Sequence, residues 1–284
     1  MKNINQLLHQ TKNLKILKSI LQNGLYSSFA LEKFSDKKLL IPMISFSNIL
    51  FRDIGQAEVV DYGSYGIGIT RETGIDYGFN PVLYVYENSV VESSIKDNFN
   101  FSILPQTLEV IKDFYKGCKC DEITQHIDFN PLPQEVKKLI NSISENTKDE
   151  LIVSIKELFE SIFENSYRQI QLAKSYKIKD KDDNTFFAYN EREWRKSYFD
   201  LNVIYETNPK GTVNPEFTKW MNTDKPHFQD SEHTLHIPIE KIKYVIVKEQ
   251  QEVFDIVKYI TELYGSVPSE LIIDTLDNLK KKED

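Results

Sequence analysis

The segment Tyr62-Gly-Ser-Tyr-Gly-Ile-Gly-Ile-Thr70 stands at the centre of residues 41–86, the stretch that decides the fold. Two further apolar runs flank it within this stretch: Ile41-Pro-Met-Ile-Ser-Phe-Ser47 before it and Asn80-Pro-Val-Leu-Tyr-Val-Tyr86 after it. Short apolar runs separated by Gly, Asp and Pro are typical of successive β-strands with tight connections. We therefore predict several strands in this stretch.

Three glycines, Gly63, Gly66 and Gly68, are spaced closely in the central run. Glycine weakens a strand, so its repeated use indicates that another backbone or a ligand comes close. The interleaved tyrosines, Tyr62 and Tyr65, favour a strand that lines a binding site. A bulged strand or a barrel corner explains the same spacing, and spacing alone does not separate the two interpretations.

The composition is that of a folded protein, because 40% of the 284 residues are hydrophobic and 12% are aromatic. The formal net charge of −8 comes from 43 acidic and 35 basic residues. This balance gives no support to broad nucleic-acid binding, which needs a basic surface. The two cysteines, Cys118 and Cys120, are too close for an ordinary disulfide, which favours a reducing compartment. With no apolar run near about 18 residues and no signal-peptide pattern, we expect a soluble cytoplasmic protein without a membrane partner.

The N-terminal segment predicts a short strand followed by a helix. Leu7-Leu-His-Gln-Thr11 is short and largely apolar, and the leucines and isoleucines after it recur at helical spacing. Asn13 can cap the start of the helix and Gly24 can end it. Residues 25–40 are predicted to be a loop with a charged end.

The middle of the chain changes character at about residue 104. Apolar positions then recur at helical spacing, above all in 134–145 and 149–173. We predict a helical insertion over 104–182 within a single α+β domain that spans 1–284.

Strand-like sequence returns over 185–206. Near the C-terminus we predict a strand over 242–248 and helices over 250–264 and 268–281, the first ended by Gly265. Within residues 185–206, the alternation of side chains along an extended strand places one set of them on a single face. The set consists of Phe187, Tyr189, Glu191, Glu193 and Arg195.

Common catalytic motifs are missing from the sequence. It has no P-loop and no G-x-S-x-G elbow, and Arg71 stands where a dinucleotide-binding fingerprint begun by Gly66 and Gly68 needs a glycine. Cys118, Cys120 and His126 are too loosely spaced for a closed structural metal site. His233 and His236 would lie on opposite faces if their segment is extended, so we predict no metal.

Glu191, Glu193 and Arg195 form the strongest candidate site in the sequence. Two carboxylates and a guanidinium on one strand face would be costly to bury unpaired. The row is therefore either a salt-bridged edge or a functional site. A pair of glutamates offers one negative charge beside a developing cation and one acceptor for a hydroxyl, and Arg195 would keep one of them ionised.

Five segments together resemble the AbiGi family of abortive-phage-resistance proteins. They are Lys37-Lys-Leu-Leu-Ile-Pro-Met-Ile-Ser-Phe-Ser47, Tyr62–Thr70, Asn80–Tyr84, Glu191-Arg-Glu-Trp-Arg195 and Ile239-Glu-Lys-Ile-Lys-Tyr-Val-Ile-Val247. The family typically has P-M-x-C-F-C-D, whereas here Ser45, Ser47 and Asn48 replace both cysteines and the aspartate, so no role for a thiol carries over. The resemblance spans most of the chain and implies an antitoxin of a phage-defence pair, with a cognate toxin or a phage protein as partner.

A more distant resemblance is to ADP-ribosyltransferase-like domains, whose opening looks like Leu8-His-Gln-Thr11 followed by the helix that ends at Gly24. It implies that NAD is a substrate and that His9 and Thr11 bind its nicotinamide ribose end. It also implies that Tyr65 or Tyr62 stacks on nicotinamide. Glu193 would be the catalytic glutamate, with Glu191 two residues before it.

The set makes physical sense, because breaking the nicotinamide–ribose bond passes through an oxocarbenium-like cation that a carboxylate would stabilise. Gly66 and Gly68 would let the cofactor lie against backbone, and Arg195 would belong to the same binding face. The fold expected from this resemblance is an ADP-ribosyltransferase-like mixed or antiparallel sheet with a helical insertion and C-terminal helices.

Two hypotheses from different classes result. In the first, the chain defends against phage by binding NAD and transferring ADP-ribose to a macromolecule; a nucleic acid as acceptor has no support from the charge. In the second, it is a non-enzymatic antitoxin or regulator that binds a partner protein, as the acidic balance and the amphipathic segment 149–173 favour. The enzyme hypothesis requires His9, Tyr65 and Glu193 to converge on one cleft.

Overall fold

The computed structural model describes residues 5–34, 37–55, 62–102, 168–179, 185–198, 201, 203–207, 212–222 and 227–283. The chain divides into two compact units, residues 1–92 with 171–284 and residues 93–170. The first unit contains the β-sheet and the charged side chains discussed below.

The strands are β1 (Leu7–Thr11), β2 (Leu25–Phe34), β3 (Lys37–Ser47), β4 (Tyr65–Ile69), β5 (Asn80–Pro81), β6 (Leu83–Val85), β7 (Ala173–Ser175), β8 (Lys177–Lys179), β9 (Thr185–Phe187), β10 (Glu193–Ser197), β11 (Ile204–Tyr205), β12 (His227–Phe228), β13 (Thr234–Leu235), β14 (Ile242–Val247) and β15 (Ile272–Thr275). The helices are α1 (Leu14–Asn23), α2 (Arg71–Asp76), α3 (Val90–Ser102), α8 (Pro215–Asn222), α9 (Gln250–Tyr264) and α10 (Leu276–Glu283), with 3₁₀ turns η1 (Phe51–Asp53), η3 (Ala188–Glu191) and η4 (Ile239–Lys241).

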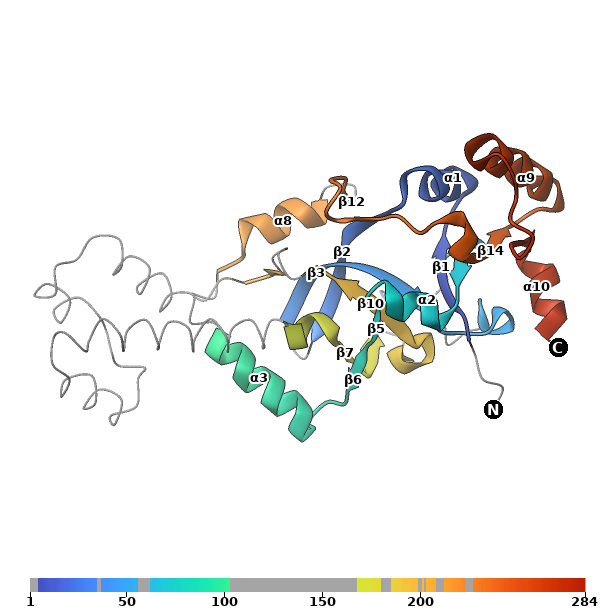
Figure 1. The fold of residues 1–284 in the computed structure, drawn as a ribbon. Helices are drawn as coiled ribbons and strands as arrows, with labels where there is room; N and C mark the ends of the chain where they lie inside the picture. Colours follow the sequence, from blue (N-terminus) through green and yellow to red (C-terminus); the bar gives the residue numbers. More distant parts are fainter. Residues whose placement is uncertain are drawn as a thin grey trace, which may run out of the picture. The chain divides into compact units, whose positions relative to one another are not determined.

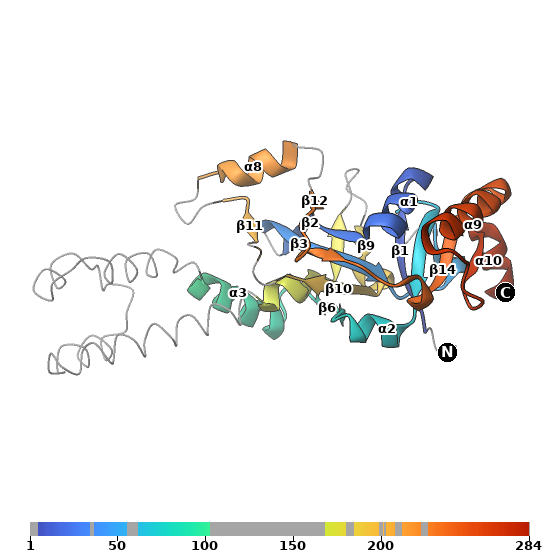
Figure 2. The ribbon, with the colours of Figure 1, turned by 45° about the horizontal axis from the view of Figure 1, so that its top comes forward.

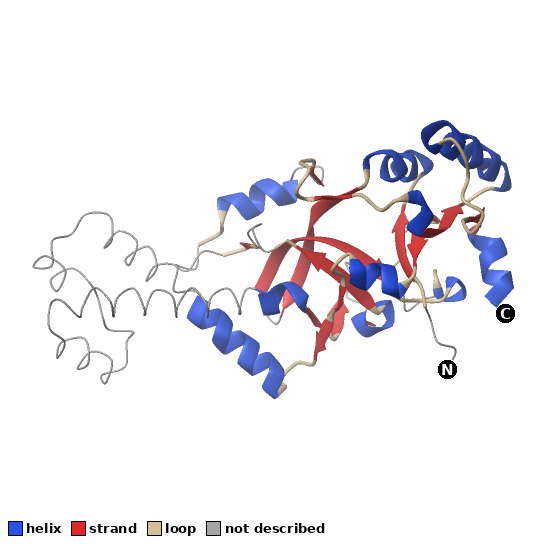
Figure 3. Ribbon diagram, in the orientation of Figure 1, coloured by secondary structure: helices blue, strands red, loops and turns tan. Residues whose placement is uncertain are grey.

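The main sheet is mostly antiparallel and follows the order β12-β2-β3-β1-β4-β14-β15 (Figure 1). The strands β5, β10, β11 and β13 pair beside this path. Figure 3 shows these strands together with the surrounding helices. The predicted α+β class is therefore confirmed, whereas an ADP-ribosyltransferase-like core is not.

Strand β3 pairs with β1, β2, β10 and β11, and its partners change along its length. Met43 pairs with both Ser28 of β2 and Ser197 of β10, and Ser47 pairs with both Leu8 of β1 and Glu193 of β10. Strands β1 and β2 therefore share the edge of β3 that lies opposite β10. On that edge, β2 pairs with β3 up to Met43 and β1 pairs with it at Ser47, so in the described strand pairs residues 44–46 of β3 have no partner there. The sheet opens at this point.

The N-terminal strand and helix form as the sequence predicts. The Asn13 side chain accepts a hydrogen bond from the Ile16 amide, and Gly24 ends α1 with a φ of 83°. The loop predicted over 25–40 is wrong, because β2 and the start of β3 occupy this range and pair with each other. The mixed polar and apolar side chains of β2 hide its alternation, and the pairing with β3 provides the order that no local signal shows.

The glycines of β4 lie where neighbouring chain comes close. A Cβ on Gly66 would be 2.4 Å from the carbonyl oxygen of His9 in β1, and one on Gly68 would be 2.9 Å from the ring of Tyr244 in β14. A Cβ on Gly63 would be 2.3 Å from the Thr11 carbonyl oxygen. Close approach of protein backbone and side chains thus accounts for the glycine spacing.

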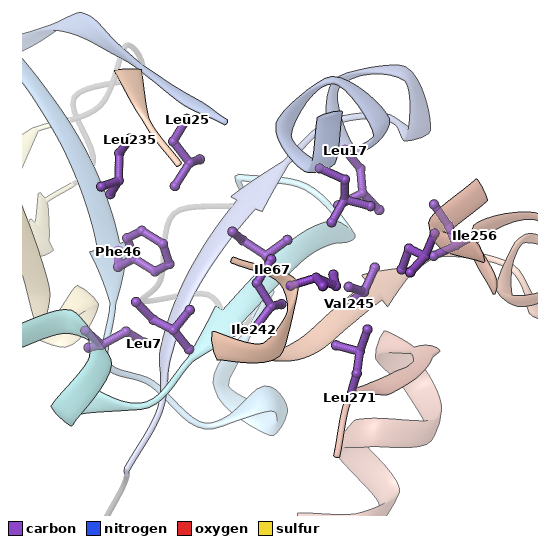
Figure 4. Packing of buried hydrophobic residues seen from close by; sticks show 14 of the residues in the cluster. Leu7, Leu17, Leu25, Phe46, Ile67, Leu235, Ile242, Val245, Ile256 and Leu271 are labelled. Carbon is purple, nitrogen blue, oxygen red and sulfur yellow. The ribbon is translucent and has the colours of Figure 1, made fainter. Parts of the chain in front are cut away.

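The hydrophobic core lies between this sheet and helices α1 and α9, which contact each other (Figure 2). Figure 4 shows Ile67 of β4 and Val245 of β14 next to Leu17 of α1 and Ile256 of α9, with Leu7 of β1 and Phe46 of β3 further from the helices. The buried residues labelled there are Leu7, Leu17, Leu25, Phe46, Ile67, Leu235, Ile242, Val245, Ile256 and Leu271.

At the C-terminus, β14 and α9 are confirmed, and α9 ends at Gly265. The helix predicted over 268–281 is wrong in its first half, because Ile272–Thr275 forms β15, parallel to β14. Helix α9 is the crossover that parallel strands require, and the two β-branched isoleucines at the start of β15 suit a strand. Only the following segment, α10, is helical.

The insertion predicted over 104–182 is too long at its C-terminal end, because β7 and β8 lie inside this range. Residues 103–167 lie outside the described residues, and the helices predicted there remain predictions. The same holds for Cys118, Cys120 and His126. No helix in the described part of the chain is long and apolar enough to cross a membrane.

Candidate functional site

A groove of about 740 Å³ lies over the opening in the sheet. Strands β1, β2 and β3 supply most of its lining, and α8 adds Trp220 and Met221. Four charged side chains that contact one another also line it: Glu32 of β2, Lys174 of β7, Glu191 of η3 and Glu193 of β10. Together with Arg195 behind them, these four are called the charge cluster below.

The segment before β10 is not the continuous strand that the sequence predicts. Strand β9 ends at Phe187, the 3₁₀ turn η3 follows, and Arg192 takes a left-handed conformation with a φ of 44°. Phe187 and Tyr189 therefore do not share a strand face with Glu193. Glu193 and Arg195 do share the buried face of β10, as period-2 alternation predicts, whereas Glu191 reaches the cluster from the turn.

Arg195 is 0% exposed and is enclosed by acceptors. Its Nε donates to Oε1 of Glu193 at 2.8 Å, its Nη2 donates to Oε2 of the same residue at 3.0 Å, and Nη2 also donates to Glu32. The backbone carbonyl oxygens of Gln171 and Ala173 accept from Nη1 at 3.2 and 3.4 Å. This bidentate pairing is the strong geometry for a guanidinium and a carboxylate.

Lys174 joins the remaining carboxylates. Its Nζ donates to Glu191 Oε2 at 2.7 Å and to Glu193 Oε2 at 2.9 Å, and lies 3.9 Å from Glu32 Oε1. The Tyr62 hydroxyl donates to Glu191 Oε1 at 3.2 Å. The cluster is thus held by β2, β7, β10 and η3, which lie far apart in the sequence.

The cations of the cluster keep Glu193 ionised. Burial acts to raise the pKa of Glu193, but Arg195 and then Lys174 outweigh burial and lower it to about 2. Burial acts to lower the pKa of Lys174, and the carboxylates of Glu32, Glu193 and Glu191 raise it well above its usual value. Glu193 is therefore a paired carboxylate with little charge free for a cationic transition state.

Four of the residues predicted for the site line the groove: His9, Tyr62, Glu191 and Glu193. His9 Nδ1 lies 2.8 Å from the Ser45 carbonyl oxygen, inside the opening of the sheet. Burial lowers the pKa of His9, and this hydrogen bond opposes the effect only in part. Although part of the Tyr62 ring is exposed, burial of its hydroxyl, and then the Glu191 carboxylate, raise its pKa.

The other predicted residues, Thr11, Tyr65, Gly66, Gly68 and Arg195, are not among those that line the groove. The Tyr65 hydroxyl instead donates to Glu252 of α9 at 2.9 Å. The convergence of His9, Tyr65 and Glu193 that an ADP-ribosyltransferase site requires is therefore not seen.

Sequence analysis missed Glu32 and Lys174. Glu32 lies in the range predicted to be a loop, and Lys174 in the range predicted to be a helical insertion. No local signal marks Glu32, because its burial together with Phe34 on one face of β2 arises only once β3 pairs with that strand. Nothing in the local sequence singles out Lys174.

In the described part of the chain, no group of three or more His, Cys, Asp or Glu side chains is arranged to hold a metal ion. His233, one of the possible ligands in the sequence, instead has Nδ1 2.6 Å from Oδ1 of Asp230.

Aromatic rings form a partly exposed cluster on β6, β9 and η3 and on the residues that directly follow β6 and β7. Consecutive ring centroids lie between 5.5 and 6.1 Å apart, and the Lys177 ammonium lies 5.3 Å from the Tyr86 centroid. Tyr86, Phe187 and Tyr189 are 53%, 40% and 50% exposed. The members of this aromatic cluster are Tyr84, Tyr86, Tyr176, Phe187 and Tyr189.

A family model described as "Putative abortive phage resistance protein AbiGi, antitoxin" matches residues 32–248. This segment contains the whole charge cluster and the whole aromatic cluster. No curated protein and no solved structure matches the chain, so the resemblance to ADP-ribosyltransferase-like domains receives no support.

Proposed function

The chain belongs to the AbiGi family, and from this premise we propose that it serves abortive-infection defence against phage as an antitoxin that binds its toxin directly. The observation that carries the proposal is the match over residues 32–248 to a family described as an antitoxin.

The state of Glu193 supports binding rather than catalysis. A glutamate that stabilises a cationic transition state must direct unbalanced charge at the reacting carbon. Here the carboxylate forms hydrogen bonds with Arg195 at both oxygens and a further one with Lys174. Its charge is already matched by these cations.

The aromatic cluster supports a protein as the partner. Exposed apolar surface marks interaction sites on soluble proteins, and tyrosine is enriched among the residues that dominate binding energy at interfaces. Tyr86, Phe187 and Tyr189 together present such a surface. An acidic chain with a formal net charge of −8 suits a basic protein partner.

The test uses the product of the gene next to this one as the candidate toxin. Expressed alone, it is expected to stop bacterial growth; expressed with this chain, growth returns, and the two purified proteins form a complex in size-exclusion chromatography. A chain that is toxic by itself, or that restores growth without forming a complex, would refute direct neutralisation. Plaque counts with and without the pair establish the role against phage.

Transfer of ADP-ribose from NAD stays a prediction from the more distant resemblance. Incubation of the purified chain with labelled NAD, with and without phage lysate, tests it through nicotinamide release or label transfer. Glu193→Gln is the control, because a catalytic glutamate would lose most activity when its charge is removed.

A further inference from the structure

We propose that the groove binds an organic cation, a guanidinium or ammonium group on a flexible apolar stem, at the Glu191 side of the charge cluster. The source of this cation rests on the proposed function: if the chain binds a toxin, the group is an Arg or Lys side chain of that partner protein. A free polyamine offers the same chemistry, and the experiment below distinguishes the two sources.

The buried charges of the cluster are not balanced. Glu32, Glu191 and Glu193 are all buried, and the cations that contact them in the described structure are Lys174 and Arg195. Three carboxylates against two cations leave one negative charge over. A buried charge without a partner is unfavourable, so a third cation would complete the cluster.

The other titratable groups that line the groove do not provide this cation. Burial lowers the pKa of His9, which keeps its ring neutral near pH 7. Lys33 and Lys38 are exposed to solvent, and Lys38 pairs with Glu206 at 2.8 Å. The Tyr62 hydroxyl donates to Glu191 without adding charge.

A buried acceptor that lacks a partner in the described part of the chain lies beside the same groove. Gln10 lines the groove, and its Nε2 donates to the Gly63 carbonyl oxygen at 2.9 Å. Its Oε1 is buried and, within the described structure, has no hydrogen-bond partner. Buried polar atoms are nearly always hydrogen-bonded, and a guanidinium or ammonium group brings several donors and no acceptor.

The shape and lining of the groove also suit such a cation. Tyr26, Phe29 and Trp220 line it, with the rings of Phe29 and Trp220 5.0 Å apart. Such walls suit an apolar stem and attract a cation to their ring faces. A volume of about 740 Å³ falls in the range of small-ligand sites, roughly 300–1,000 Å³, and so fits one side chain or one polyamine.

Isothermal titration calorimetry on the full chain tests the proposal with three probes. These are acetyl-Gly-Arg-Gly-amide, the same peptide with citrulline in place of arginine, and spermidine. Citrulline keeps the shape of arginine without its charge. The arginine peptide is expected to bind at least about tenfold more tightly than the citrulline peptide, because a charged hydrogen bond is lost.

Glu191→Gln tests the site, since it removes the excess charge and retains an acceptor for Tyr62 and Lys174. It should leave the melting temperature nearly unchanged and abolish the preference for arginine over citrulline. Gln10→Met, which removes the free acceptor, should weaken the arginine peptide severalfold. Glu262→Gln, on the exposed face of α9 and outside the groove, is the matched control and should bind like the unaltered chain.

Binding of the arginine and citrulline peptides with the same measurable affinity, or an unaffected Glu191→Gln variant, would overturn the proposal, as would no binding of any probe at millimolar concentration. Binding of spermidine but not of the arginine peptide supports the cation site and assigns it to a free polyamine. The proposed function is tested separately, by toxin neutralisation in cells. A chain that neutralises its toxin and binds none of these cations would refute only the cation site.

Discussion

Replacing Arg195 with methionine should destabilise the fold strongly. The substitution keeps an apolar stem of similar length but leaves three carboxylates facing Lys174 alone. Breaking a buried ion pair by removing one partner destabilises a protein by about 3–5 kcal/mol. Arg195 and Lys174 together lower the pKa of Glu193 from 4.5 to about 2, which corresponds to about 3 kcal/mol for the two cations combined.

The assay is urea denaturation of the purified variant at pH 7, followed by circular dichroism. Lys38→Met is the matched control; it breaks the exposed pair with Glu206 and should change the free energy of unfolding by no more than about 1 kcal/mol. If Arg195→Met loses as little as this control, the cluster does not hold the fold together and the reasoning is refuted.

The pH dependence gives a second check on the same cluster. The pKa of Glu193 is lowered in the folded state, so its contribution to stability is fully present above its unfolded pKa and disappears as the pH falls from about 4.5 towards 2. The unaltered chain should lose stability over this range. The difference between it and Arg195→Met should shrink, because protonation relieves the uncompensated carboxylates of the variant. A difference that stays constant from pH 7 to pH 3 would contradict this account.

Two further predictions concern β4 and the aromatic cluster. Gly66→Ala would place a methyl group 2.4 Å from the His9 carbonyl oxygen. It should lower the free energy of unfolding by at least about 2 kcal/mol, in the upper part of the usual range for overpacking. The control is Gly265→Ala, whose Cβ meets nothing within 4 Å and which should lose only about 1 kcal/mol because of its positive φ. Equal melting temperatures for these two variants would show that β1 and β4 do not approach so closely. Changing both Phe187 and Tyr189 to serine should alter stability by less than about 1 kcal/mol, because the two side chains are 40% and 50% exposed. The same change should weaken the complex with the toxin at least tenfold in a pull-down titration, and an unchanged complex would remove the aromatic cluster from the interface.

Local signals were enough to predict the elements that a short stretch of chain can specify. The cap at Asn13 and the stop at Gly24 define α1, and Gly265 ends α9. Strands β3, β4 and β14 follow from apolar runs between turn residues. For the two helices, the residues that give the signal also make the capping contacts, within a few positions of each other.

Strands β2 and β15 could not be predicted in this way, because their order depends on distant partners. Strand β2 has a mixed pattern and forms hydrogen bonds with β3. Strand β15 follows a turn, lies parallel to β14 and continues directly into α10. Strand pairing provides the stability that the local sequence of each segment does not show.

The sequence by itself determined that Glu193 and Arg195 share a strand face, since side chains alternate along any strand, and it carried the segments that identify the family. Only the tertiary structure decided that these two charges are buried and paired. Glu32 approaches Arg195 across 163 positions of sequence, and Lys174 approaches Glu193 across 19. Alternation is a property of the local backbone, whereas compensation of a buried charge depends on whatever the folded chain brings within hydrogen-bond distance.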